Sequence, residues 1–209
     1  MGWISQWLAV AALVRHAACM QWTVRTARPE DATEIARINV AAWQHAYRGI
    51  VADPVLDRML PESRLPGWTR VLALPEPSAV FVSVSDDGTI GAYCAVDAVR
   101  EVGDAHPDLD TGEMTAIYAD PRFKGTGAGH EVHEAAVRHL LEHGFRYAVL
   151  WVFQDNTPSR EFYEAHGWRH DGVVHRYELG DQELPEVRYA RFLSAPRRRR
   201  STPAARRRS

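Results

Sequence analysis

A glycine-rich run, Lys124–Gly129, has the residue types and spacing to bind a phosphate group. It reads Lys-Gly-Thr-Gly-Ala-Gly and lies between a strand-like and a helix-like segment. Glycines permit backbone conformations in which several N–H groups converge on one anion. The following helix adds its free N–H groups and the positive end of its dipole at the same point. The run therefore predicts a loop for a diphosphate; the alternative is a tight turn without a ligand.

The spacing of these glycines excludes two common nucleotide-binding loops. A P-loop needs Gly-Lys followed by Ser or Thr at the start of the helix, but His130 follows Gly129. A dinucleotide fingerprint needs glycines at its first, third and sixth positions. The sixth residue is His130 counted from Gly125, and Val132 counted from Gly127. The loop therefore belongs to a different class of phosphate site.

A second segment carries polar groups that could bind a ligand and move a proton. Asn156 follows the apolar run Tyr147–Phe153, and Tyr163 lies in a predicted helix over Pro158–His166. An amide can hydrogen-bond a polar ligand, and a phenol can donate a proton to a leaving group. The alternatives are a turn residue at Asn156 and a packing role for Tyr163.

The hydrophobic pattern predicts the elements that must position these groups. Strands are expected at residues 22–28, 79–84, 90–96, 113–119, 147–153, 173–179 and 186–192. A first helix is expected to begin at Pro29 and to end within residues 43–49, where a loop begins. A second is expected over Asp53–Leu60, ended by Pro61. Further helices are expected over Trp68–Leu74, 130–143 and 158–166. Core-facing residues in the helices are Ile35, Ile38, Ala42, Val132, Ala136 and Leu140. The order β-αα-βββ-α-β-α-ββ predicts a mixed α/β fold.

The two segments together resemble the GNAT superfamily of N-acetyltransferases. Residues 117–129, Ile-Tyr-Ala-Asp-Pro-Arg-Phe-Lys-Gly-Thr-Gly-Ala-Gly, are similar to the family's Q/R-x-x-G-x-G/A motif for acetyl-coenzyme A. Residues 150–168 are similar to its strand, Asn and Phe-Tyr-x-x-x-Gly-Phe/Trp segment. The resemblance covers roughly residues 22–193. Two segments in the right order are more specific than either alone.

The resemblance implies a mostly antiparallel central sheet flanked by helices and a direct transfer of acetyl from acetyl-coenzyme A to a primary amine. In the family, backbone N–H groups before the loop stabilise the tetrahedral oxyanion, and Tyr163 matches the acid that protonates the leaving thiolate. The cofactor-binding residues would be Ile117, Tyr118, Ala119, Lys124, Gly125, Thr126, Gly127, Ala128, Gly129, His130 and Asn156. Lys124 departs from the family's Gln or Arg, and Glu131 and His133 replace apolar helix residues.

A general base and an acceptor site are also needed for the predicted reaction. An ammonium must lose a proton before attack, so a carboxylate or an ordered water is needed. Glu113 opens the strand that leads to the acetyl site and is the candidate base; the alternative is a surface carboxylate at a strand end. His45 and Tyr47 resemble the family's acceptor-lining loop; the alternative is packing. Antibiotic amines, polyamines, amino acids and protein N-termini all stay open as small-molecule or peptide acceptors.

No metal cofactor is predicted. His139 and His143 lie four residues apart on one predicted helix, and His166, His170 and His175 follow. No H-E-x-x-H sequence is present and no cysteine supports these histidines, so exposed side chains are the preferred interpretation.

Composition bounds the partners and the compartment. The 209 residues are 45% hydrophobic and 25% charged, which suits a globular domain. The tail 196–209 holds seven arginines, so the rest of the chain has a formal net charge of about −9. This negative charge makes the rest of the chain an unfavourable partner for nucleic acid. This acidic body weakly favours a cationic amine. Two cysteines without disulfide or zinc spacing indicate a reducing, cytoplasmic compartment.

Three regions are expected along the chain. Residues 1–19 form an N-terminal extension, helical or disordered, 20–195 form the acetyltransferase domain, and 196–209 form a disordered tail. The apolar run Trp7–Val14 is shorter than the about 20 residues of a membrane span, and no basic residue precedes it. No membrane association is therefore expected; the alternative is a working signal segment or a membrane anchor. A homodimer, an inactive acyl-coenzyme A sensor of the same fold, and nucleic-acid binding through the tail stay open.

Overall fold

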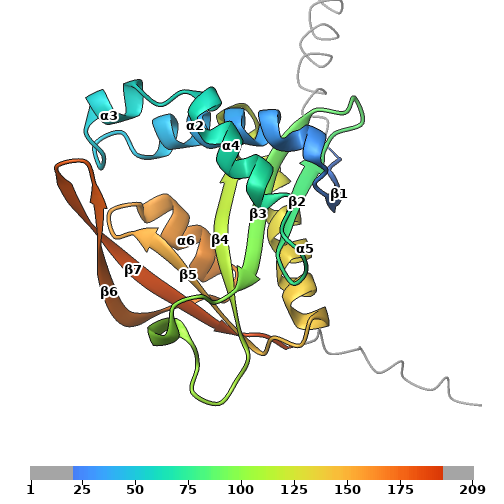
Figure 1. Cartoon of the computed structure of the whole chain (residues 1–209), viewed down its shortest axis with the longest axis vertical. Coiled ribbons are helices and arrows are strands. Elements are labelled where there is room, and N and C mark those ends of the chain that lie inside the picture. Colours follow the sequence, from blue (N-terminus) through green and yellow to red (C-terminus); the bar gives the residue numbers. More distant parts are fainter. Residues whose placement is uncertain (1–20, 195–209) are drawn as a thin grey trace, which may run out of the picture.

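Seven strands form one sheet in the computed structural model, which describes residues 21–194 (Figure 1). The strands are β1 (Thr23–Thr26), β2 (Ala79–Val84), β3 (Ile90–Ala98), β4 (Thr111–Ala119), β5 (Tyr147–Phe153), β6 (Arg169–Leu179) and β7 (Gln182–Phe192). Their order is β1-β2-β3-β4-β5-β7-β6, and every neighbouring pair is antiparallel except β4 and β5. The predicted mostly antiparallel sheet is confirmed. The predicted extension 1–19 and tail 196–209 lie outside the described residues.

Helices cover both faces of this sheet. They are α2 (Ala32–Ala46), α3 (Asp53–Asp57), α4 (Pro61–Val71), α5 (Ala128–Glu142) and α6 (Thr157–Ala165), with 3₁₀ turns at Pro29–Asp31, Val102–Asp104 and Pro121–Phe123. On one face Ile35 and Ile38 of α2 pack against β2 and β3. On the other, α5 contributes Val132 and Leu140 to the core that α6 joins through Tyr163. The predicted core faces of α2 and α5 are therefore confirmed.

One helix begins earlier than the sequence pattern predicts. Pro61 was expected to end a helix, and Trp68 to begin the next. Instead Pro61 occupies the first turn of α4, which continues through Pro66 to Val71. Proline suits the first turn because its φ is already helical and its missing N–H would have no partner there. The observed order is β-ααα-βββ-α-β-α-ββ.

Strands β4 and β5 separate after a short paired stretch. They are paired at only three positions, the last of which joins Glu113 to Val149. Beyond this point β4 continues to Ala119 and β5 to Phe153 without pairing to each other. The facing edges of the two strands therefore keep backbone groups that a ligand can bond.

A β-bulge at Thr115 changes which side chains of β4 face each helical layer. Met114 is paired with Val96 and Ala116 with Ala95, so Thr115 is the extra residue. Met114 packs in the core that includes α5, whereas Ala116 packs in the core that includes α2. The bulge therefore lets Met114 and Ala116, two residues apart, face different helical layers.

The two helix residues that depart from the family pattern are accommodated differently. His133 is fully buried, and its Nε2 accepts a hydrogen bond of 2.9 Å from the indole of Trp168. Glu131 is exposed on the first turn of α5.

None of the helices in the described part of the chain combines the length and the hydrophobicity that a membrane span needs.

Candidate active site

A cavity of about 590 Å³, here called the loop cavity, lies where β4 and β5 separate. Its size is that of small-molecule sites in proteins. Most of the residues that the sequence predicted line it: His45, Tyr47, Ile117, Tyr118, Ala119, Lys124, Gly125, Gly127, Gly129, His130, Asn156 and Tyr163. The fold therefore brings the end of α2, the strand β4, the glycine loop and α6 to one place.

The glycine loop leaves open space for a ligand. Gly125 and Gly127 have φ of +79° and +94°, which favours glycine. A Cβ added at either residue, or at Gly129, would meet no atom within 4 Å. The first helical bond of α5 runs from the amide of Glu131 to the carbonyl of Gly127, at 3.1 Å. The three amides between them have no helical acceptor and can bind an anion, so the loop fits a diphosphate.

Two predicted loop residues have side chains that do not line the cavity. Ala128 is buried in the core beside α5. The hydroxyl of Thr126 donates to the carbonyl of Phe123 at 2.7 Å and accepts from the indole of Trp22 at 3.1 Å. These side chains shape the loop rather than face its ligand. Trp22 was missed because no local spacing connects it with a loop 104 residues away.

Asp120 fixes the start of the loop. Its carboxylate is 1% exposed and accepts from the backbone N–H of Arg122 at 2.9 Å, from the Arg122 guanidinium at 2.7 Å, and from Arg37 of α2. Burial opposes ionisation, but these hydrogen bonds outweigh it and hold the pKa of Asp120 well below its usual range. An ionised carboxylate therefore ties the loop to α2.

Two polar side chains reach the loop cavity from α6. Asn156 is almost fully buried, and its Oδ1 caps the helix by accepting from the amide of Ser159 at 3.3 Å. It therefore has a local structural role and lines the cavity as well. Tyr163 is also buried, and its hydroxyl forms no hydrogen bond with the described residues. Burial, reinforced by Tyr118, raises the pKa of the Tyr163 phenol well above its usual value, so this phenol stays protonated.

The backbone of β4 directs donors toward β5. The amide of Asp120 bonds the carbonyl of Gly91 at 2.8 Å, so Asp120 faces β3. Successive residues of an antiparallel strand point their backbone groups to opposite edges. The N–H groups of Ala119 and Ile117 therefore point toward the unpaired edge, beside the loop cavity.

The predicted acceptor residues and the predicted base are placed differently. Tyr47 lines the loop cavity, and its hydroxyl is 3.0 Å from that of Tyr118; His45 lines the same cavity and is exposed. Glu113 does not line it: this residue sits in the paired part of β4, below the point of separation. Burial and the nearby Asp104 raise the pKa of Glu113. Among the described residues, no Asp or Glu lines the loop cavity, so the role of Glu113 stays a prediction.

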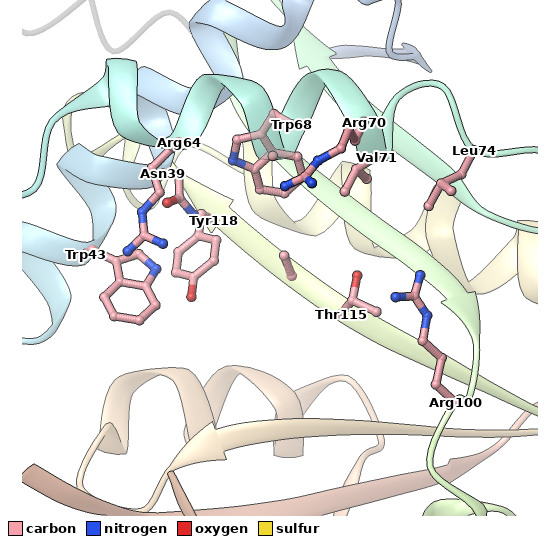
Figure 2. Close-up of a pocket in the computed structure, with 12 residues that line it drawn as sticks. Asn39, Trp43, Arg64, Trp68, Arg70, Val71, Leu74, Arg100, Thr115 and Tyr118 are labelled. Carbon is pink, nitrogen blue, oxygen red and sulfur yellow. The ribbon is translucent and has the colours of Figure 1, made fainter. Parts of the chain in front are cut away.

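A second cavity of about 540 Å³, here called the arginine cavity, lies between α4 and β4 (Figure 2). Its charged side chains are Arg64, Arg70 and Arg100, and it has no acidic lining residue in the described part of the chain. Arg100 is paired with Asp97 at 2.6 Å, whereas Arg64 and Arg70 form no ion pair within residues 21–194. The cavity therefore carries positive charge that its own walls do not neutralise.

Aromatic side chains and part of β4 complete the arginine cavity. The guanidinium of Arg64 lies over the ring of Trp43, 5.3 Å from its centroid. Trp68 and Tyr118 are further aromatic lining residues. Thr115, Ala116 and Tyr118 line both cavities, which therefore meet along the second half of β4.

A sequence model of the acetyltransferase (GNAT) family matches residues 40–168 of the chain. The chain belongs to this family. It is an acyltransferase, as the resemblance of the two motif segments predicted. The predicted fold class and family are both confirmed.

Two of the relatives of this chain are named as acetyltransferases. An uncharacterized N-acetyltransferase of Bacillus subtilis is 29% identical over 145 residues, which cover 69% of this chain and 78% of the relative. A mycothiol acetyltransferase of a Nocardioides species is 27% identical over 174 residues, covering 80% of this chain and 57% of the relative. The chain thus spans little more than half of that longer enzyme.

Solved structures share the fold. A putative phosphinothricin N-acetyltransferase has a TM-score of 0.64 at 21% identity and covers 84% of this chain and 100% of its own. A putative acetyltransferase of Salmonella typhimurium, solved with its cofactor acetyl-CoA, has a TM-score of 0.63 at 19% identity, covering 88% and 99%.

Proposed function

We propose that the chain binds acetyl-coenzyme A in the loop cavity and transfers the acetyl group directly to a primary amine in the arginine cavity. The observation that carries this proposal is the shared wall of the two cavities. Thr115, Ala116 and Tyr118 of β4 line both, so ligands in the two cavities meet at one strand. Transfer requires this, because the amine must approach the thioester carbon closely.

The groups around the loop cavity support acetyl-coenzyme A as its ligand. The open glycines and free amides of the loop fit the diphosphate. The unpaired edge of β4 offers N–H groups of Ile117 and Ala119, which suit the pantetheine arm and the negative charge that develops on the thioester oxygen. Tyr163, protonated and without a hydrogen-bond partner among the described residues, is the proposed donor to the departing sulfur.

The charge of the arginine cavity supports an acceptor that bears an acidic group as well as an amine. Arg64 and Arg70 form no ion pair within residues 21–194, and both lie on α4 at the wall of the cavity. Guanidinium groups bind carboxylate and phosphate in a bidentate manner. The acidic body of the chain, without its arginine tail, favoured a cationic acceptor. The local charge at the cavity outweighs it because distant charges are screened.

Acceptor preference and arginine variants test this assignment. Thiol release from acetyl-CoA would be followed with amines that carry a carboxylate or phosphate, with polyamines, and with uncharged amines. We expect the acid-bearing amines to have the highest kcat/KM, and Arg64→Gln or Arg70→Gln to lower it about 10–100-fold through loss of a charged hydrogen bond. The KM for acetyl-CoA should not change. Arg58→Gln, at an exposed position outside both cavities, is the matched control.

Two results would contradict the acceptor class. One is a preference for polyamines over acid-bearing amines. The other is an equal loss of activity with charged and uncharged acceptors in the Arg64 and Arg70 variants. Either result would be compatible with acetyl transfer and would exclude only the proposed acidic group on the acceptor.

A further inference from the structure

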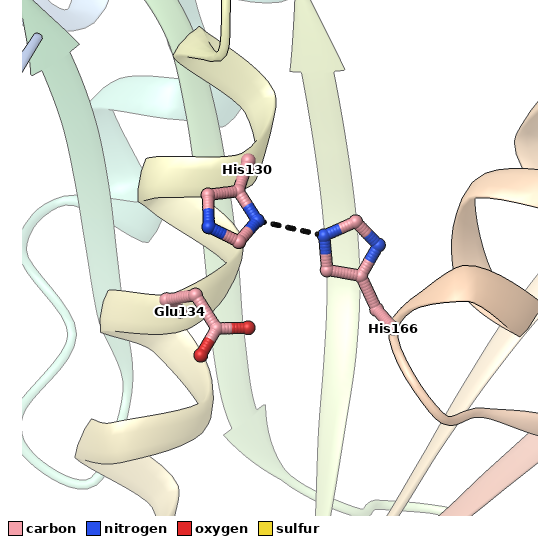
Figure 3. Close-up of side chains that lie close together, drawn as sticks. All are labelled: His130, Glu134 and His166. Carbon is pink, nitrogen blue, oxygen red and sulfur yellow. Dashed lines mark hydrogen bonds between the residues drawn. The ribbon is translucent and has the colours of Figure 1, made fainter.

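Two histidines and a glutamate come together between α5 and the end of α6 (Figure 3). His130 and Glu134 are four residues apart on α5, which places them on one helix face. His166, at the C-terminal end of α6, faces them. One side-chain ligand atom of each residue lies within 4.8 Å of the other two. Nδ1 of His130 and Nε2 of His166 are 2.9 Å apart.

A hydrogen bond to the backbone fixes the proton of His166. Its Nδ1 is 2.7 Å from the carbonyl oxygen of Phe162, which can only accept, so Nδ1 carries a proton. In the neutral ring, Nε2 then has a free lone pair, and this lone pair faces His130. Histidines that bind metals almost always donate their other N–H to a carbonyl or carboxylate in this way.

A buried chain of hydrogen bonds orients Glu134. The indole of Trp168, which is only a donor, lies 2.9 Å from Nε2 of His133, so this nitrogen accepts. Nδ1 of His133 must therefore carry the proton, and it donates to Oε1 of Glu134 at 3.0 Å. His133 is fully buried. The carboxylate is thus held by a rigid partner, and its second oxygen remains for another ligand.

We propose that His130, Glu134 and His166 form a binding site for a divalent transition-metal ion, with Zn²⁺ as the best fit. Two imidazoles and one carboxylate are a known zinc ligand set, in which a fourth position stays open. Tetrahedral zinc places ligand nitrogens about 3.3 Å apart, so the two rings need to separate by only a few tenths of an ångström. The three side chains are exposed or half-buried, so an ion can enter from solvent.

This site revises the prediction that no metal binds. That prediction rested on the absence of H-E-x-x-H and of cysteine ligands. It considered His139, His143, His166, His170 and His175, but neither His130 nor Glu134. Nδ1 of His143 lies 2.9 Å from the backbone carbonyl oxygen of His139, and its Nε2 lies 3.2 Å from the carboxylate of Glu76. Both ring nitrogens of His143 are therefore already engaged, which makes this residue, at the C-cap of α5, a suitable control.

Zinc binding by the full-length chain tests the proposal. Protein freed of metal by dialysis against a chelator would be titrated with Zn²⁺ in competition with a chromophoric chelator. We expect the parent to bind Zn²⁺ at this site. The affinity for Zn²⁺ should be at least about tenfold lower in His130→Gln and in Glu134→Gln. His143→Gln should bind like the parent. Mg²⁺ at the same concentration should not compete, because it prefers oxygen ligands.

The outcome can be read without any enzyme assay and does not depend on the proposed transfer. His130 is exposed on the first turn of α5, so its substitution removes no core contact, and an unchanged Tm of the metal-free protein would confirm this. The proposal is overturned if His130→Gln and Glu134→Gln bind Zn²⁺ as tightly as the parent. It is overturned equally if the parent shows no zinc binding that these substitutions remove.

Discussion

The indole N–H of Trp22 lies 3.2 Å from the carbonyl oxygen of Thr126 and 3.1 Å from its hydroxyl, and so joins the start of β1 to the glycine loop. The same ring meets Phe123 edge-on, with centroids 5.3 Å apart. It also fills the space beside Gly91, where a Cβ would come within 2.3 Å of the indole. A residue remote in sequence therefore holds the loop in the shape that its free amides require.

Trp22→Phe is expected to weaken the binding of acetyl-CoA. The substitution keeps the aromatic contact and removes the donor, which costs about 1 kcal/mol of loop stabilisation. The KM for acetyl-CoA should rise about fivefold while kcat changes little. Thr126→Val, which removes the hydroxyl acceptor, should act in the same direction. Steady-state kinetics at saturating acceptor would measure both, and an unchanged KM in both variants would contradict this role.

Tyr163→Phe is expected to lower kcat about 100-fold with little change in the KM for acetyl-CoA, because the acid acts only as the thiolate leaves. Burial raises the pKa of this phenol, so in the parent it stays protonated up to at least its usual value of about 10. Ionisation of Tyr163 should therefore cause no loss of rate below that pH. Tyr177→Phe, at a partly exposed phenol outside both cavities, is the control. A kcat equal in the two variants would exclude Tyr163 as the acid.

Glu113→Gln tests the predicted base through the pH dependence of the rate. Burial and Asp104 raise the pKa of Glu113. A base acts when deprotonated, so in the parent kcat/KM should rise with pH through this raised pKa, and the variant should lose that limb. Since the folded pKa lies above the unfolded one, Glu113 stabilises the fold at low pH and loses this contribution as pH rises. A variant that is more stable at pH 7 but keeps the parent's pH–rate profile would show that Glu113 is structural only.

Asp120→Asn is expected to destabilise the protein by about 2 kcal/mol at pH 7, because Arg37 and Arg122 lose a buried charged partner. The folded pKa of Asp120 is depressed, so its contribution is present above the unfolded value of about 3.9 and is lost as pH falls toward the folded one. Urea unfolding should therefore show a constant gap between parent and variant from pH 5 to 8, and a smaller gap at pH 3. A gap that does not depend on pH would argue against an ionised Asp120.

Much of the fold follows from local patterns. The run Tyr147–Phe153 is apolar throughout and forms β5 at those bounds, and the helical spacing of Val132, Ala136 and Leu140 is buried as predicted. Pro61 was misplaced because proline both ends helices and begins them. Only the packing of α4 on the sheet decides between the two.

The candidate site was predictable where the chemistry lies in contiguous residues. The loop and Tyr163 line one cavity as the motifs indicate. The bulge at Thr115 was not visible in the sequence, and neither was the arginine cavity, because Arg64 and Arg100 come from separate elements that only the tertiary fold joins. The contact of Trp22 with Thr126 depends on the same long-range packing.

The most direct test of the central claim is whether the purified chain releases free coenzyme A thiol from acetyl-CoA when an acid-bearing amine is added. Acetyl transfer through the meeting point of the two cavities predicts release that depends on the amine, with the acetylated amine as product by mass spectrometry, and a much slower release in Tyr163→Phe. Binding of acetyl-CoA by calorimetry without thiol release for any class of amine would contradict it. That result would show that the loop cavity holds its ligand but does not transfer the acetyl group.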